Sequence, residues 1–299
     1  MKQKPPIQNG NTATARTGVV IMLSAGALIA ATSLLAKTLS LPLADTPGLH
    51  PFQISAGRFL FALFALLLFI AVFRNRRPTL QGANWRWHIA RSLCGWLGVT
   101  AMFAAVARMP VAEATALSFL SPVVTMGLAI VLLGEYLTLR KVIAASLALA
   151  GAVLILRPGV EAFQPAGLLA LVAAGCMGLE AIYIKRLSDS ESALRILLIN
   201  NMVGALISVV VASTVWLWPV PNQWALLVAL GMVMVAGQAL FIQAMKRGEA
   251  SFVMPAFYSV LVFAALYDLI FCRIFLTSTA LLGAALIVGS AIVLTQRVR

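Results

Sequence analysis

The acidic residue Glu180 stands inside a long apolar stretch of this sequence, five residues before Lys185. A charged side chain at the centre of a membrane helix costs about 2.5–3.5 kcal/mol on insertion scales, so an embedded one is a functional candidate. Desolvation favours the neutral form of a carboxyl group, so Glu180 is suited to take up a proton; ionised, it would bind a cationic ligand. Alternatively, an ion pair with Arg91 or Lys185 anchors one end of its helix. A helix also places Tyr183 on the same face as Glu180.

Arg58 lies near the start of another apolar stretch. A guanidinium group binds carboxylate or phosphate through two parallel hydrogen bonds, which suits an anionic ligand. The alternatives are that Arg58 extends outward to the polar interface, or that it pairs with Glu113. Two further charged residues have simpler explanations. Asp268 is predicted to pair with Arg273, about one turn away, and the long stem of Lys37 reaches the interface.

Aromatic side chains and one amide are the second group of candidates. Aromatic rings that face a cavity stack on a flat ligand, but rings that pack in a core or face lipid look the same in sequence. The amide of Gln238 is able to hydrogen-bond a ligand or to join two helices. The predicted ligand-binding residues are Trp96, Phe103, Phe119, Tyr183, Gln238, Phe241 and Tyr258.

Two prolines interrupt apolar stretches. Pro122 and Pro255 each remove a backbone hydrogen bond and kink the helix that contains them. Freed carbonyl groups line cavities in some membrane proteins, so both prolines are predicted to take part in gating. Small residues instead mark close-packing faces. These are Ala144, Ala148 and Ala152 in one stretch, and Ala285 with Gly289 in another.

Membrane helices must position these residues. The 299 residues are 62% hydrophobic and only 10% charged, whereas soluble domains are near a quarter charged. A membrane helix needs about 20 apolar residues, and ten stretches of the sequence are long enough. Their predicted ranges are 18–39, 51–73, 87–108, 111–133, 140–157, 165–186, 194–216, 223–245, 250–271 and 277–295.

Lysine and arginine residues gather on one side of this ten-span arrangement. Basic loops mark the cytoplasmic side, so both termini are predicted to be cytoplasmic, with residues 1–17 as a short cytoplasmic tail. The net charge of +13 therefore needs no nucleic-acid partner, because the basic residues lie between apolar spans. Three scattered cysteines form neither a disulfide framework nor a metal-site spacing. We predict no metal site and no cofactor.

The second half of the sequence repeats the first at an offset of 138 residues. Without a gap, the segment Phe103–Leu156 aligns with Phe241–Leu294, so that Phe119 falls on Phe257 and Ser121 on Ser259. The predicted repeats are residues 18–157 and 165–295. Because each holds five spans, an odd number, the two must be inverted relative to each other. Inverted repeats are the architecture of secondary transporters, with the substrate site near mid-membrane at the repeat interface.

Several motifs together resemble the drug/metabolite transporter superfamily, specifically its ten-helix EamA-type members. They are Arg58-Phe59-Leu60, the segment 117–123 (LSFLSPV), Leu132-Leu133-Gly134-Glu135, Gly151 and Arg157-Pro158-Gly159. The resemblance covers nearly the full length. The second copy departs from the pattern, because Val260 replaces Pro122 and Cys272-Arg273 replaces Gly134-Glu135.

The resemblance implies a secondary active transporter that moves a small organic metabolite across the bacterial inner membrane by alternating access. The family includes amino-acid exporters and importers of riboflavin and S-adenosylmethionine. The run from Arg91 to Ala105, followed by Met109-Pro110, looks closest to the metabolite-uptake branches, which favours a vitamin such as riboflavin or a similar heterocycle. An amino-acid or drug exporter of the same superfamily is the alternative within the family.

The expected partners are a small-molecule substrate and the lipid bilayer, with the proton as candidate coupling ion and a monomer or homodimer as the assembly. The substrate cavity is predicted to be lined by spans one, three, four, six, eight and nine. An enzyme is not expected, since His50 and His88 sit at span ends on opposite sides and no His-Glu-x-x-His motif or phosphate-binding loop occurs. A channel or a membrane scaffold is the alternative from another class.

Overall fold

The computed structural model describes residues 9–42, 47–73, 78–106, 108–109, 111–157, 165–273 and 277–296. Within these ranges the chain is helical and contains no strand. Ten helical stretches are long and apolar enough to cross a membrane, and they begin and end within a few residues of the predicted spans. The predicted all-α, ten-span fold class is therefore confirmed.

The helices divide between the two halves of the chain. The first half contains α1 (Asn9–Ser40), α2 (Pro51–Val72), α3 (Trp85–Val106), α4 (Val111–Ser118), α5 (Ser121–Leu133) and α6 (Leu139–Leu156). The second half contains α7 (Pro165–Ser190), α8 (Ala193–Ala212), α9 (Pro221–Arg247), α10 (Ala250–Val253), α11 (Ser259–Cys272) and α12 (Ser278–Thr295), with short 3-10 segments η3 (Ser213–Val215) and η4 (Met254–Tyr258). Since α1 begins at Asn9, the second part of the predicted tail 1–17 is helical; residues 1–8 lie outside the described part.

The last helix of each half begins at a hydroxyl cap. The side chain of Thr138 accepts the N–H of Lys141 at the start of α6, and that of Thr277 accepts the N–H of Ala280 at the start of α12. Each hydroxyl satisfies one of the N–H groups that a helix start leaves without an internal partner. Local sequence therefore sets these two boundaries.

The fourth and ninth spans are both interrupted. A turn at Phe119 and Leu120 separates α4 from α5, and η4 separates α10 from α11. The helices after the breaks start at Ser121 and Ser259, which the repeat offset aligns. Pro122 lies in the first turn of α5, where proline fits a helix start, and Pro255 lies within η4. Both prolines thus sit at real interruptions, while their role in gating stays a prediction.

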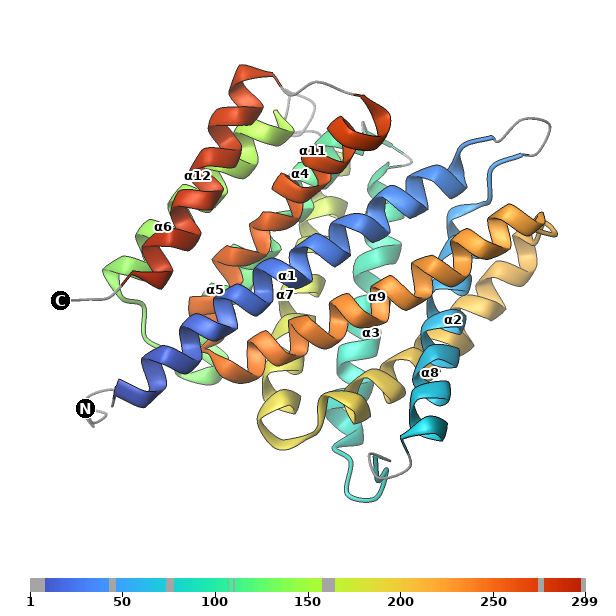
Figure 1. The fold of residues 1–299 in the computed structure, drawn as a ribbon, viewed down its shortest axis with the longest axis horizontal. Helices are drawn as coiled ribbons and strands as arrows, with labels where there is room; N and C mark the ends of the chain where they lie inside the picture. Colours follow the sequence, from blue (N-terminus) through green and yellow to red (C-terminus); the bar gives the residue numbers. More distant parts are fainter. Residues whose placement is uncertain are drawn as a thin grey trace.

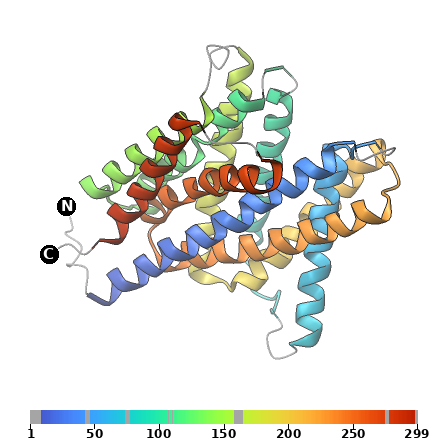
Figure 2. The ribbon, with the colours of Figure 1, turned by 45° about the horizontal axis from the view of Figure 1, so that its top comes forward.

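The helices pack in pairs that the two halves exchange. The first helix of each half packs along the third span of the other half. Thus α1 lies along α9, and α7 lies along α3. The second helices, α2 and α8, pack on each other, and so do the last helices, α6 and α12, which run side by side (Figure 1). This exchange supports the predicted inverted repeat. The start of α1 and the end of α12 lie toward the same end of the molecule in both views (Figure 2).

Two glycines allow α6 and α12 to cross closely. A Cβ added at Gly151 would lie 2.5 Å from the carbonyl oxygen of Gly283, and one added at Gly283 would lie 2.6 Å from that of Gly151. The predicted face of Ala144, Ala148 and Ala152 is buried as expected. The prediction for α12 was wrong, because Ala285 is exposed and Gly289 has open space around it. The small residue that permits the contact is Gly283.

Candidate functional site

Three charged side chains from different helices gather inside the helical bundle. Arg91 on α3 places its Nη2 3.7 Å from Oε1 of Glu180 on α7. Arg58 on α2 lies close enough to interact electrostatically with the same carboxylate. We call Arg58, Arg91 and Glu180 the ionic cluster. It holds two cations and one anion, so it carries a net positive charge whenever Glu180 is ionised.

Both arginines of the ionic cluster have N–H donors that could bind a further group. Nε of Arg58, and both Nε and Nη1 of Arg91, are buried without a hydrogen-bond partner among the described residues. The side chain of Arg91 is only 1% exposed, whereas that of Glu180 is 24% exposed. Buried N–H groups without partners are costly, and guanidinium donors bind carboxylates in pairs. The cluster is therefore suited to receive a carboxylate while Glu180 stays accessible to a cation or a proton.

The structure shows which partners the embedded charges have, while their role in transport stays a prediction. Glu180 contacts Arg91, whereas Lys185 bonds to Asp189 and to the carbonyl of Met245. The suggestion that Arg58 pairs with Glu113 was wrong, because no ion pair joins these two described residues. Instead, the guanidinium of Arg58 lies 4.4 Å from the centre of the Phe59 ring.

A glycine on α3 makes room for the carboxylate of Glu180. A Cβ added at Gly95 would lie 3.1 Å from Oε2 and 3.3 Å from Oε1 of Glu180. These separations are tighter than ordinary van der Waals contact, so any other residue at this position would push the carboxylate away from α3. Gly95 is one turn from Arg91, and it thus helps to set the distance between Arg91 and Glu180. No sequence pattern marks this role, because glycine is common in membrane helices.

The predicted aromatic residues fall into separate ring contacts. Phe241 packs edge-on against Phe257 with ring centres 5.5 Å apart. Tyr258 is 1% exposed, and its ring lies 6.3 Å from that of Phe119. Tyr183 packs on Trp87 at 5.6 Å. Three of these rings lie at the interruptions of spans four and nine, namely Phe119, Phe257 and Tyr258, and Phe241 lies on α9.

Three predicted site residues have other surroundings. Trp96 is 40% exposed and shares an exposed apolar stripe of α3 with Leu93 and Leu97, as expected of a face turned to lipid. The side chain of Phe103 lies outside the described part. Oε1 of Gln238 is buried without a partner among the described residues, so this amide has capacity for a further hydrogen bond.

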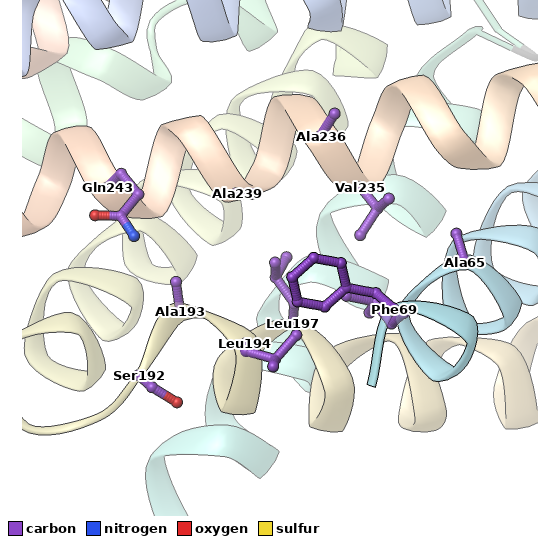
Figure 3. Close-up of a pocket in the computed structure, with 11 residues that line it drawn as sticks. Ala65, Phe69, Ser192, Ala193, Leu194, Leu197, Val235, Ala236, Ala239 and Gln243 are labelled. Carbon is purple, nitrogen blue, oxygen red and sulfur yellow. The ribbon is translucent and has the colours of Figure 1, made fainter. Parts of the chain in front are cut away.

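A mainly apolar pocket of about 600 Å³ lies between α2, α8 and α9 (Figure 3). Its polar residues are Ser192 and Gln243, and Phe69 extends into it from α2. None of the predicted site residues lines this pocket, and two of its three helices are spans two and seven, which the predicted cavity did not include. Gln243 is already engaged, since its Oε1 accepts a hydrogen bond from Arg247.

Sequence reasoning missed a buried acid where the two halves meet. Glu191, in the turn between α7 and α8, accepts the N–H of Asn84 and lies 2.9 Å from Nε2 of His88. Its side chain is 2% exposed, and Arg195 lies 3.7 Å away on the same chain segment. The residues are far apart in sequence and stand at span ends, where charged side chains are ordinary. Only the packing of α3 against α7 and α8 brings them together.

The interrupted spans, the pairwise exchange of helices and the embedded charges define a multi-pass membrane transporter. A model of the EamA-like transporter family matches residues 16–157 and, a second time, residues 164–296. The chain therefore belongs to the EamA-like transporter family and is an integral membrane protein that transports a small molecule; it is not an enzyme.

Several curated proteins are similar over most of the chain. An S-adenosylmethionine uptake transporter of Rickettsia felis is 30% identical over 82% of this chain and 82% of its own length. A riboflavin transporter of Vibrio cholerae is 26% identical over 93% of both chains, and a pseudopaline exporter of Pseudomonas aeruginosa is 26% identical over 70% of this chain and 74% of its own. A crystal structure with 22% identity superposes with a TM-score of 0.78 over 93% of this chain and 96% of that one, which supports the fold alone.

Proposed function

We propose that this protein is a secondary active transporter that takes up a zwitterionic metabolite with a flat heterocycle, of the S-adenosylmethionine class. The observation that carries the proposal is the ionic cluster, in which the buried Arg91 and the half-buried Arg58 have buried N–H donors without a partner among the described residues and stand beside one accessible carboxylate. A substrate carboxylate would bind Arg58 and Arg91, and the cationic part of the substrate would lie near Glu180. The similarity to S-adenosylmethionine uptake transporters supports this substrate class.

Transport by alternating access across the bacterial inner membrane completes the proposal. The two five-helix repeats would rock around the site, which inverted repeats permit because the same contacts form in turn on either side. The interruptions of spans four and nine support this mechanism, since broken helices at corresponding positions are typical of transporter sites. Glu180 is the proposed proton acceptor that couples uptake to the proton gradient.

Riboflavin is the second candidate substrate, favoured by the similarity of the riboflavin transporter over nearly the full chain and by the aromatic contacts of Phe241 and Tyr258. Its ring system would use those aromatic side chains, but it carries no carboxylate for the arginines. The two substrates therefore predict different roles for Arg91.

The test is uptake of each radiolabelled substrate into proteoliposomes that contain the purified protein. We expect S-adenosylmethionine to accumulate, and Arg91→Met to lower its uptake by about ten- to a hundredfold, the value of a charge-assisted hydrogen bond of about 1.5–3 kcal/mol. The control Lys246→Met removes an exposed cation from the end of α9 and should leave uptake unchanged. Accumulation of riboflavin alone would favour the second candidate, and accumulation of neither would overturn the proposed substrate classes.

A further inference from the structure

The two halves are joined at one end of the bundle by a glutamate that caps a helix of the other half. Glu135, just after α5, accepts the N–H of Ala250 at 2.7 Å and the N–H of Ser251 at 2.8 Å, and its Oε2 also accepts the hydroxyl of Ser251. A carboxylate at a helix start satisfies unpaired N–H groups and interacts favourably with the helix dipole. Glu135 thus fixes the end of α5 to the start of α10.

A lysine strengthens the same junction. Nζ of Lys141 donates to the hydroxyl of Ser251 at 2.7 Å and to the carbonyl of Tyr136 at 2.8 Å, and it forms an ion pair with Glu249. Glu135 and Lys141 are 8% and 4% exposed, so the centre of the junction is shielded from water, while Glu249 lies at its exposed edge. We call Glu135, Lys141, Glu249 and Ser251 the inner latch, because the predicted topology places them on the cytoplasmic side.

The repeat offset of 138 residues defines the counterpart of this latch at the opposite end. Arg273 corresponds to Glu135, and Glu113 corresponds to Ser251. In the helix itself Arg273 takes the left-handed end position of α11 (φ 55°), which in α5 belongs to Gly134 (φ 68°), the residue before Glu135. Glu113 lies in the first turn of α4. At the counterpart, the acid Glu113 therefore stands at the start of α4, where the second half has Ser251, and the cation Arg273 stands at the end of α11, where the first half has Glu135.

The counterpart contact is not formed in this structure. Glu113 is 8% exposed, and its Oε2 is buried with no hydrogen-bond partner in the part of the chain that the structure describes. Arg273 is exposed, and the acid predicted to pair with it, Asp268, instead bonds to Lys37 at 2.9 Å. Within the described residues neither Glu113 nor Arg273 forms an ion pair, and α4 and α11 do not pack together as α5 and α10 do.

We propose that Glu113 and Arg273 are an outer latch, which closes when the inner latch opens to the cytoplasm. The inference rests on the alternating access of the proposed function. A buried carboxylate oxygen without a partner is destabilising, and a partner in a second state would account for it. In that state the Arg273 guanidinium would approach the start of α4 and neutralise Glu113. The structure described here is then the state closed on the inside.

The test uses a cysteine pair in a variant whose native Cys94, Cys176 and Cys272 are replaced by alanine. Glu113→Cys and Arg273→Cys are introduced together, and the protein is oxidised with copper phenanthroline in membranes supplied with S-adenosylmethionine. We expect a disulfide between positions 113 and 273, identified by mass spectrometry of the linked peptides. Uptake should fall by about tenfold or more, because a transporter locked in one state cannot alternate, and a reductant should restore it.

Two further pairs serve as controls. Glu135→Cys with Ser251→Cys should crosslink the inner latch without substrate. Glu113→Cys with Arg157→Cys pairs the same acid position with another exposed arginine at the outer end, and it should not crosslink. Absence of the 113–273 disulfide, or full uptake by the crosslinked protein, would overturn the outer latch.

A charge exchange gives an independent readout without cysteines. Glu113→Arg or Arg273→Glu alone should lower uptake, and the double variant should recover it to within about twofold, as a directly interacting pair does. Additive losses in the double variant would contradict the pairing. If the wild-type protein transports neither S-adenosylmethionine nor riboflavin, the proposed function fails instead, while the mass-spectrometric crosslink still decides whether the two residues meet.

Discussion

The hydroxyl of Tyr258 donates a hydrogen bond of 2.7 Å to the carbonyl of Phe119 and so joins the interruptions of two spans. Phe119 lies in the turn that ends α4, and Tyr258 is the last residue of η4. The turn and η4 occupy corresponding positions of the two repeats, since the offset places Phe119 on Phe257. The bond gives the carbonyl of Phe119 a hydrogen-bond donor at the helix break. It also links the two halves at positions where the helical hydrogen bonding is interrupted.

Loss of this hydroxyl should therefore destabilise the protein. Tyr258→Phe leaves the carbonyl of Phe119 without this donor in a buried site, which should lower the free energy of unfolding by about 1 kcal/mol. The melting temperature of the detergent-purified protein measures the effect. Tyr136→Phe is the control, because Tyr136 is 64% exposed. Equal melting temperatures for the two variants would mean that the bond contributes nothing.

Removing the charge of Glu180 should separate coupling from binding. Glu180→Gln keeps the shape of the side chain and fixes its neutral state. We expect proteoliposomes to lose accumulation driven by a pH gradient while they retain substrate exchange, at a raised KM because the substrate cation no longer meets a carboxylate. Both activities are measured with labelled substrate, per correctly folded molecule. If accumulation stays near wild type while thermal stability falls, Glu180 anchors the helix through Arg91 and carries no proton.

The membrane-spanning fold could be predicted because bilayer thickness imposes it on the sequence. A span must hold about 20 apolar residues, and charged loops must flank it, so the ten spans were visible from hydropathy alone. The positions of Pro122 and Pro255 indicated the breaks. Composition could not reveal that α12 crosses α6 at Gly283 rather than at Gly289. The small residues of a helix cannot be told apart in sequence until the position of the partner helix is known.

The sequence predicts individual residues of the site but not which of them lie close together. Glu180 and Arg58 were visible as charges in apolar stretches, but Arg91 entered only as a partner, since it lies nearer the start of its span. The pairing of Asp268 with Lys37 rather than Arg273 depends on the packing of α1 against α11, which no local pattern encodes. Likewise, Glu135 was recognised in a motif, but its partners on α10 lie 115 and 116 residues away.

A methyl group at position 95 should disturb the ionic cluster without unfolding the chain. Gly95→Ala would push the carboxylate of Glu180 from α3 by a few tenths of an ångström, so we expect the KM for uptake to change several-fold, by about 1 kcal/mol or less. Gly98→Ala is the matched control, because its Cβ would meet Met177 and Cys176 in the same α3–α7 contact rather than a charged group. Equal kinetic effects of the two variants would indicate simple overpacking.

The topology prediction concerns the side on which both chain ends lie. The Lys/Arg asymmetry predicts that both lie in the cytoplasm. The start of α1 and the end of α12 lie toward the same end of the fold (Figure 2). A fluorescent protein fused after Arg299 should therefore be bright, and alkaline phosphatase fused there should be inactive. Active phosphatase would reverse the orientation and place the inner latch on the outer side.

The crossing of α6 and α12 should be the position least tolerant of added volume. Gly151→Ala and Gly283→Ala each direct a methyl group at the partner helix's backbone, 2.5 Å and 2.6 Å from a carbonyl oxygen. Backbone cannot move aside as a side chain does, so each variant should lose about 1–3 kcal/mol of stability, and the melting temperature in detergent should fall accordingly. Gly289→Ala adds the same methyl group to α12 at a position where no atom of the described residues lies within 4 Å, and it should melt like the wild type. Because both glycines contact each other, the double variant Gly151→Ala/Gly283→Ala should lose less than the sum of the two single losses, since the first methyl group already separates the helices. Strict additivity would mean that the two helices do not cross at these residues.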